Sequence, residues 1–301
     1  MRSAFPALAL ALLAAPSALA GPQENVADKD AKDALEKFEA AFATEDLDFK
    51  VEAVERLRKV LHPLVAERLF KVAVGDPQAM VRAAAFRGIG LQKPSKGALG
   101  PKLCKFLSDA AEASRKAKAR GDYGIRIDTK TGEVDTESDE GKAALRAKRE
   151  KGKMLAEAVR ALDALGCRER DSVDCLREFL GDGNDDLVAL CLGMFGKWKE
   201  WSVLSPDLLF LFELYPNEND FETGSISVDT GAAGSADAQA AKRKWNAKYG
   251  DPDKRRPRPV VVKALKKALF DITGQEFADP KALREYVGRP EVKRKIKYGG
   301  K

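Results

Sequence analysis

The stretch that decides the fold runs from Asp76 to Gly90 and reads DPQAMVRAAAFRGIG. Its apolar residues recur at three- and four-residue intervals, which places them on one face of an α-helix. The residues of this face are Val81, Ala84, Ala85 and Ile89. Asp76 is of a type that caps a helix start, and Pro77 suits the first turn. The stretch therefore predicts a helix whose small-residue face packs closely against neighbouring helices.

The same spacing organises most of residues 28 to 215. Apolar residues recur every three or four positions in segments of about 10 to 25 residues, a usual length for helices. Breaks such as His62-Pro63 separate the segments, and few of them are rich in strand-favouring residues. We interpret His62 as a structural residue of a helix–helix joint. The sequence predicts an all-α fold.

The stretch from 76 to 90 resembles the second helix of a HEAT repeat. The family pattern is an Asp that opens the helix, Val-Arg five and six residues later, then Ala positions, a Leu or Ile, and a Gly. The residues that match are Asp76, Val81, Arg82, Ala84, Ala85, Ile89 and Gly90. The resemblance implies an armadillo-like α-solenoid, in which antiparallel helix pairs stack on their neighbours.

Two further stretches fit the same pattern. The second copy runs from 182 to 196, and its matching residues are Asp182, Leu187, Leu190, Cys191, Phe195 and Gly196. Val188 stands there where the family has Arg, so the usual Asp–Arg ladder is interrupted. A weaker third copy begins at Asp46, with Val51 in the place of Val81. We therefore expect the repeat array to cover residues 21–215.

A different pattern interrupts this array at residues 121–141. Residues 123–128 and 133–138 alternate in polarity and flank the turn sequence Thr129-Lys130-Thr131-Gly132, which predicts a small β-hairpin. A long insertion in a repeat array often emerges on its binding face. A decorative loop is the other interpretation, and both stay open.

The C-terminal part divides into a Gly- and Ser-rich loop at 216–234 and a basic helical cap at 235–301. Thr273-Gly274-Gln275, then Phe277, Asp279-Pro280 and Leu283 resemble the C-terminal piece of exported bacterial HEAT-repeat proteins. The resemblance implies a repeat-like cap without catalytic activity. Gly274 suits a left-handed helix stop, and Phe277 is expected to fold back onto the preceding helix.

The N-terminus has the features of a signal peptide over residues 1–20. Arg2 precedes an apolar run, and Ala18-Leu19-Ala20 suits cleavage after Ala20. The run is shorter than the roughly 20 apolar residues that span a bilayer. An exported mature protein is the expectation, with an uncleaved N-terminal anchor as the alternative.

Charge is unevenly distributed along the chain. The formal net charge is +6, yet residues 242–301 alone hold 19 basic and 7 acidic residues. Such asymmetry can mark a polyanion-binding segment, while solvated helix surface is the simpler explanation. The candidate residues are Lys242, Arg243, Lys244, Lys248, Lys254, Arg255, Arg256 and Arg258. Because prolines keep this linker extended, Arg255, Arg256 and Arg258 are expected to project into solvent.

The four cysteines lack metal-site spacing, and one His cannot complete a zinc set. Cys104 and Cys191 lie among apolar residues and are interpreted as small buried side chains. Cys167 and Cys175 flank a helix turn, where either a disulfide or two unpaired thiols is compatible with export.

Other motifs favour structural roles. Residues 182–186 resemble a calcium loop, but Leu187 and Gly193 occupy the positions that an EF-hand gives to Gly and Glu, so helix capping is the better explanation. Trp198 and Trp201, three residues apart on one predicted helix, suit core packing better than ligand stacking. No P-loop, nucleophile elbow or dinucleotide fingerprint is present.

Three functions are compatible with these features. The first is an exported, non-enzymatic α-solenoid scaffold that binds another protein. The second is binding of an acidic envelope polysaccharide or nucleic acid through the basic segment. The third is an enzyme, by analogy with HEAT-like lyases, and it has no support beyond the fold. We predict no catalytic residue, cofactor or metal ligand.

Overall fold

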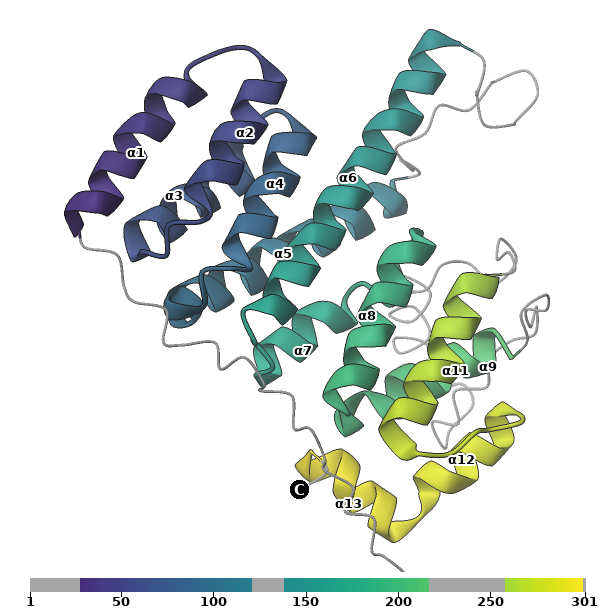
Figure 1. The fold of residues 1–301 in the computed structure, drawn as a ribbon. Coiled ribbons are helices and arrows are strands. Elements are labelled where there is room, and N and C mark those ends of the chain that lie inside the picture. Colours follow the sequence, from purple (N-terminus) through teal and green to yellow (C-terminus); the bar gives the residue numbers. More distant parts are fainter. Residues whose placement is uncertain (1–27, 121–137, 217–257, 300–301) are drawn as a thin grey trace, which may run out of the picture.

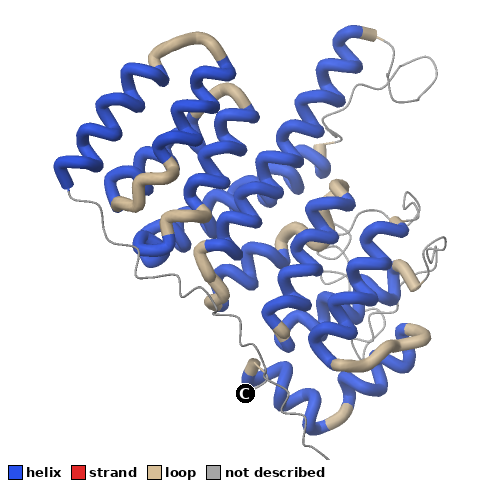
Figure 2. The backbone as a smooth tube through the Cα atoms, in the orientation of Figure 1, coloured by secondary structure: helices blue, strands red, loops and turns tan. Residues whose placement is uncertain are grey.

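The structure is a computed structural model, and it describes residues 28–120, 138–216 and 258–299. In these ranges every regular element is a helix, so the all-α prediction is confirmed there (Figures 1 and 2). The proposed signal peptide lies outside the described residues, as do positions 121–137 of the proposed hairpin and nearly all of the 216–234 loop. Residues 139–141, which we assigned to the hairpin insertion, belong to a helix instead.

The helices follow one another closely along the chain. The N-terminal ones are α1 (Asp28–Phe42), α2 (Leu47–Leu57), α3 (Pro63–Gly75) and α4 (Ala79–Ile89). The central ones are η1 (Lys93–Ser95), α5 (Lys96–Ala119), α6 (Asp139–Ala164), α7 (Arg170–Arg177) and α8 (Asp185–Trp198). The C-terminal ones are η2 (Trp201–Val203), η3 (Leu204–Leu208), α9 (Leu209–Leu214), α11 (Pro259–Thr273), α12 (Pro280–Gly288) and α13 (Pro290–Tyr298).

The helices form two layers. In one layer α2, α4, α6, α8 and α11 lie side by side in that order. In the other, α1 packs beside α3, α3 beside α5, and α5 beside α7. Helices that are consecutive in sequence pack across the two layers, as α3 does on α4. Because α11 packs extensively on α8, it continues the layer of α8.

One continuous core runs between the layers, and α4 lies in the middle of its N-terminal half. The apolar face that the sequence predicts for α4 is confirmed, because Val81, Ala84, Ala85 and Ile89 are all fully buried. Gly88 allows α4 to approach α2 closely, since a Cβ at this position would lie 2.9 Å from the Cβ of Arg58. Burial of this face supplies the main driving force for packing of the N-terminal helices.

The helix starts use polar side chains in ways that only partly match expectation. Asp46 caps α2, accepting hydrogen bonds from the amides of Asp48 and Phe49. Asp76 instead ends α3 and accepts from the Gln78 amide at 2.8 Å, so it shapes the turn before α4. Asn184 caps α8, not Asp182.

His62 has the structural role predicted for it. It is buried, and its Nδ1 accepts a hydrogen bond from the Leu64 amide at the start of α3. Its Nε2 lies 2.9 Å from a carboxylate oxygen of Asp28 on α1. His62 thus ties the α2–α3 joint to the first helix.

The two tryptophans do not share one helix, because α8 ends at Trp198 and Lys199 is left-handed. Trp201 is buried in the core, as predicted, whereas Trp198 is half-buried and donates a hydrogen bond to Asp163 at 2.9 Å. Within the ranges described above, none of the helices combines the length and apolarity needed to cross a bilayer.

The C-terminal helices end as the sequence indicates. Gly274 ends α11 in a left-handed conformation with φ 72°, as predicted. Phe277 packs against Tyr286 of the following helix α12, with ring centroids 5.2 Å apart, and its contact with the preceding helix stays a prediction.

Candidate functional site

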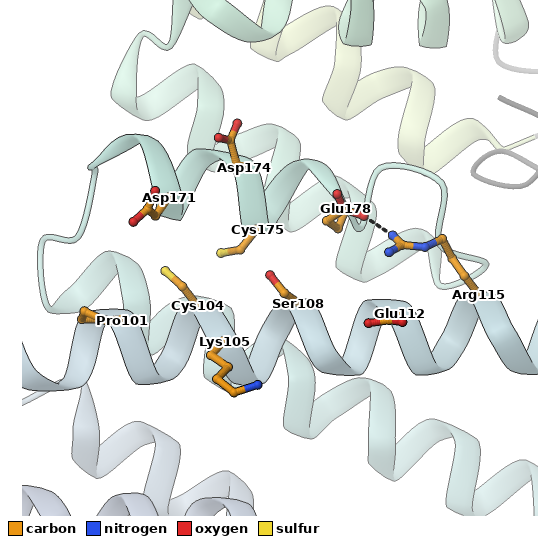
Figure 3. Close-up of a pocket in the computed structure, with 10 residues that line it drawn as sticks. All are labelled: Pro101, Cys104, Lys105, Ser108, Glu112, Arg115, Asp171, Asp174, Cys175 and Glu178. Carbon is orange, nitrogen blue, oxygen red and sulfur yellow. Dashed lines mark hydrogen bonds and ion pairs between the residues drawn. The ribbon is translucent and has the colours of Figure 1, made fainter. Parts of the chain in front are cut away.

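A groove of about 440 Å³ lies between α5 and α7 (Figure 3). Both helices belong to the same layer, and each contributes one wall. The lining residues from α5 are Pro101, Cys104, Lys105, Ser108, Glu112 and Arg115, and those from α7 and the residue after it are Asp171, Asp174, Cys175 and Glu178. The groove therefore combines two thiols with a set of charged side chains.

The two thiols are the chemically distinctive feature of this groove. The sulfur atoms of Cys104 and Cys175 point toward each other from opposite walls (Figure 3). Ser172 joins them, because its Oγ lies 3.5 Å from the sulfur of Cys104 and its carbonyl oxygen accepts from the Cys175 thiol at 3.2 Å. The side chains of these residues are thus fixed relative to one another.

The surroundings shift the pKa values of the two thiols in opposite directions. A hydrogen bond from Cys175, helped by one from Ser172, lowers the pKa of Cys104 to about 7 in spite of partial burial. The same contact with Cys104, together with burial, raises the pKa of Cys175 above its ordinary value. Cys104 is therefore the thiol that ionises first.

Most charged side chains of the groove are already paired. Arg115 forms an ion pair with Glu178 across the groove. Lys105 binds Asp109 at 2.8 Å, one turn along α5. Asp174 lies 2.8 Å from Arg177. Of these pairs, Arg115 with Glu178 joins the two walls, while the other two lie within a single helix.

The other two cysteines differ from this pair. Cys191 is fully buried in α8, as predicted, and burial raises its pKa. Burial also raises the pKa of Cys167, to about 11. All four cysteines are free thiols in the structure, and Cys175 faces Cys104. Of the two alternatives for Cys167 and Cys175, the structure thus has the unpaired thiols, and the neighbour of Cys175 is Cys104.

A second groove, of about 370 Å³, lies at the C-terminal end. Its lining residues are Ser205, Leu209, Arg284, Val287, Gly288, Lys293, Ile296 and Lys297. Lys293 and Lys297 lie one turn apart on α13, and both are exposed. Arg284 adds a third cation and binds Glu213 on α9. Among the described residues, this groove is lined by three cations, Ser205 and otherwise uncharged residues.

The predicted polyanion-binding residues are only partly described. Lys242, Arg243, Lys244, Lys248, Lys254, Arg255 and Arg256 lie outside the described residues. Arg258 is described, and the expectation that it projects into solvent is wrong, since only 9% of its side chain is exposed.

The position of Arg258 has a clear physical cause. Its guanidinium lies 2.9 Å from a carboxylate oxygen of Asp185 and donates to the carbonyl oxygen of Asp182 at 2.7 Å. It also lies over the ring of Tyr215, 5.8 Å from the centroid. Because α11 packs along α8, its first residues meet the acidic start of α8, a contact that proline content alone does not predict.

Residues 182–186 act as helix-start residues, as the capping interpretation requires. Asp182 accepts from the Asn184 amide at 2.8 Å. Within the described part of the chain, no group of three or more His, Cys, Asp or Glu residues is placed to hold a metal ion.

Sequence reasoning missed two features of these grooves. The contact between Cys104 and Cys175 joins helices far apart in the chain, and local spacing carries no signal for it. Lys293 and Lys297 were counted only as part of the basic segment, although their four-residue spacing could have placed both on one helix face.

Neither a family model, nor a curated protein, nor a solved structure matches this chain.

Proposed function

We propose that this chain is an exported α-solenoid scaffold that binds another protein along one edge of its helix array. The observation that carries the proposal is a set of exposed apolar side chains at that edge. Phe49 and Met80 are 61% and 53% exposed, and Val74 lies nearby at the end of α3. Export rests on the N-terminal sequence, and the solenoid on the two stacked layers together with the HEAT-like stretches.

The two-layer packing brings these side chains to the same edge. Phe49 lies in the first turn of α2, and Met80 in the first turn of α4. Helices α2 and α4 are neighbours in one layer, and each follows a helix of the other layer, so both run in the same direction. Their first turns are therefore adjacent. Exposed large apolar side chains that gather on one surface are typical of protein-binding sites.

The opposite edge provides a matched control. Leu64 lies in the first turn of α3 and Leu91 just after α4, and they are 43% and 45% exposed. They are similar to Phe49 and Met80 in apolarity and exposure. They lie, however, at the connections from α2 to α3 and from α4 to α5, at the other end of these helices. A partner that binds one edge should not respond to changes at the other.

The test is affinity capture from the native cell envelope with three forms of the full mature chain. We expect the parent and the Leu64→Ser/Leu91→Ser variant to retain the same partner protein, at low and high salt. The Phe49→Ser/Met80→Ser variant should lose it at least about tenfold, because the anchors of such interfaces carry about 1.4 kcal/mol or more each. Equal capture by all three folded forms would contradict the proposal.

A second candidate function is binding of an acidic polymer, and the basic groove favours it. Three cations, Arg284, Lys293 and Lys297, line a groove that also has apolar side chains in its lining. Such a surface attracts sulfated or phosphorylated polymers through counterion release.

Heparin chromatography distinguishes this candidate from general positive charge. Lys293→Ser/Lys297→Ser removes two charges from the groove, whereas Lys263→Ser/Lys266→Ser removes two from the exposed side of α11. Groove binding predicts a clearly lower elution salt for the first variant and a small change for the second. Equal shifts would indicate nonspecific attraction to the net charge.

A further inference from the structure

We propose that Cys104 and Cys175 form a thiol–disulfide exchange site, which reacts with small disulfide molecules that enter the groove between α5 and α7. The product is an internal disulfide that joins these two helices. The proposal does not depend on which macromolecule the chain binds, because it concerns only the residues of this groove.

The geometry brings together what such a reaction requires. The two sulfurs face each other from separate helices, and both cysteines line the groove (Figure 3). Ser172 contacts both side chains and holds their rotamers. The groove, at about 440 Å³, has room for a small disulfide beside the sulfurs.

Cys104 is the attacking residue and Cys175 the resolving residue. Cys104 is 8% exposed and Cys175 3% exposed, so a reagent in the groove meets Cys104 first. The contact with Cys175 lowers the pKa of Cys104, which raises its thiolate fraction at a given pH, and the thiolate is the form that attacks a disulfide. The raised pKa of Cys175 keeps this thiol protonated until its partner has reacted.

The reaction balances as two exchange steps with a disulfide RS–SR. The thiolate of Cys104 attacks one sulfur, the S–S bond of the reagent breaks, and the first RS⁻ leaves and takes a proton. The thiolate of Cys175 then attacks the sulfur of Cys104 in this mixed disulfide and expels the second RS⁻. The two cysteines together lose two electrons and two protons, and the reagent is reduced to two RSH molecules.

The remaining cysteines cannot substitute for this pair. Cys191 is fully buried, and Cys167 is 1% exposed. The sulfur of Cys167 lies against α5 at Gly100, where an added Cβ would come within 2.9 Å of it. Neither residue lines the groove.

The experiment uses the full, reduced chain and the uncharged reagent 2-hydroxyethyl disulfide, followed by acid quenching and mass spectrometry. We expect the parent to lose two of its four thiols, to retain no adduct and to yield one peptide pair linked through Cys104 and Cys175. The Cys175→Ser variant should retain one adduct, located at Cys104. In the Cys104→Ser variant, Cys175 should react at least about tenfold more slowly than Cys104 does in the parent.

The Cys167→Ser variant is the matched control and should behave like the parent. Circular dichroism and thermal melting establish that each variant is folded before its reactivity is compared. A folded parent that keeps all four thiols would overturn the proposal. A link from Cys175 to Cys167, or a stable mixed disulfide on Cys104 of the parent, would overturn it as well.

Discussion

The two stretches that we compared with a HEAT repeat, at α4 and α8, bury their apolar faces alike but make different polar contacts where the helices begin. Both bury the residue at the same position in the pattern, Val81 in α4 and Leu187 in α8. At the start of α4, Arg82 reaches back and donates to the carbonyl oxygen of Ala73 at the end of α3, at 2.9 Å. At the start of α8, Val188 occupies the place of Arg82 and contributes only apolar surface.

At the start of α8, a distant part of the chain supplies the cation that Val188 cannot provide. Arg258, just before α11, binds both Asp185 and the carbonyl oxygen of Asp182. A contact that is local in the first copy is thus made between helix pairs in the second. The difference shows that two helix starts of similar sequence can satisfy their polar groups with partners from different parts of the chain.

The largest effect should come from a charge placed in either apolar face. Val81→Asp and Leu187→Asp would each bury an unpaired carboxylate among fully or almost fully buried neighbours. We expect each to reduce the free energy of unfolding by about 3 to 5 kcal/mol, measured by denaturant unfolding.

The matched control for this prediction is Met80→Asp, because Met80 adjoins Val81 but is exposed. It should change stability by less than about 0.5 kcal/mol. If Val81→Asp and Met80→Asp were equally well tolerated, the assignment of the buried face would be incorrect.

A smaller but specific effect should follow loss of the distant cation. Arg258→Ala removes the contact with the Asp185 carboxylate and the hydrogen bond to the carbonyl oxygen of Asp182, and we expect a loss of about 2 kcal/mol. Arg82→Ala removes one half-buried contact to a carbonyl oxygen and should cost about 1 kcal/mol.

The pair of variants tests the comparison directly. If Arg82→Ala were more damaging than Arg258→Ala, the cation of the second copy would not replace that of the first. Arg258→Lys keeps the charge but loses the two-point contact, so its melting temperature should fall between those of the parent and Arg258→Ala.

The sequence predicts contacts between residues that are close in the chain, but it does not predict contacts between distant residues. The apolar face of α4, the cap at Asp46 and the left-handed stop at Gly274 follow from residues within a few positions of one another. Arg258 with Asp185, and Cys104 with Cys175, are each about 70 residues apart in the chain. Their proximity depends on how helix pairs stack, and spacing within one helix does not encode this.

The helix caps offer a further contrast of about 1 kcal/mol. Asn184 accepts hydrogen bonds from the amides of Asp186 and Leu187, whereas Gln78 at the start of α4 makes no capping bond with its side chain. Asn184→Ala should therefore destabilise the protein by about 1 kcal/mol, and Gln78→Ala should be nearly neutral. Comparable melting temperatures for the two variants would contradict this contrast.

The smallest predicted effect is a gain in stability at Gly193. This glycine is exposed in the middle of α8, and a Cβ there would meet no atom within 4 Å. Gly193→Ala should stabilise the protein by about 0.5 to 1 kcal/mol, since alanine loses less backbone freedom in a helix.

At Gly196, three residues later in α8, the change to alanine should destabilise the protein instead. At Gly196 a Cβ would lie 3.1 Å from the Cβ of Asp271 and 3.2 Å from the backbone of Ala268, so α11 would have to move away from α8. Thermal melting of the two variants therefore tests how tightly α11 packs on α8. A higher melting temperature for Gly196→Ala than for the parent would show that this contact is loose.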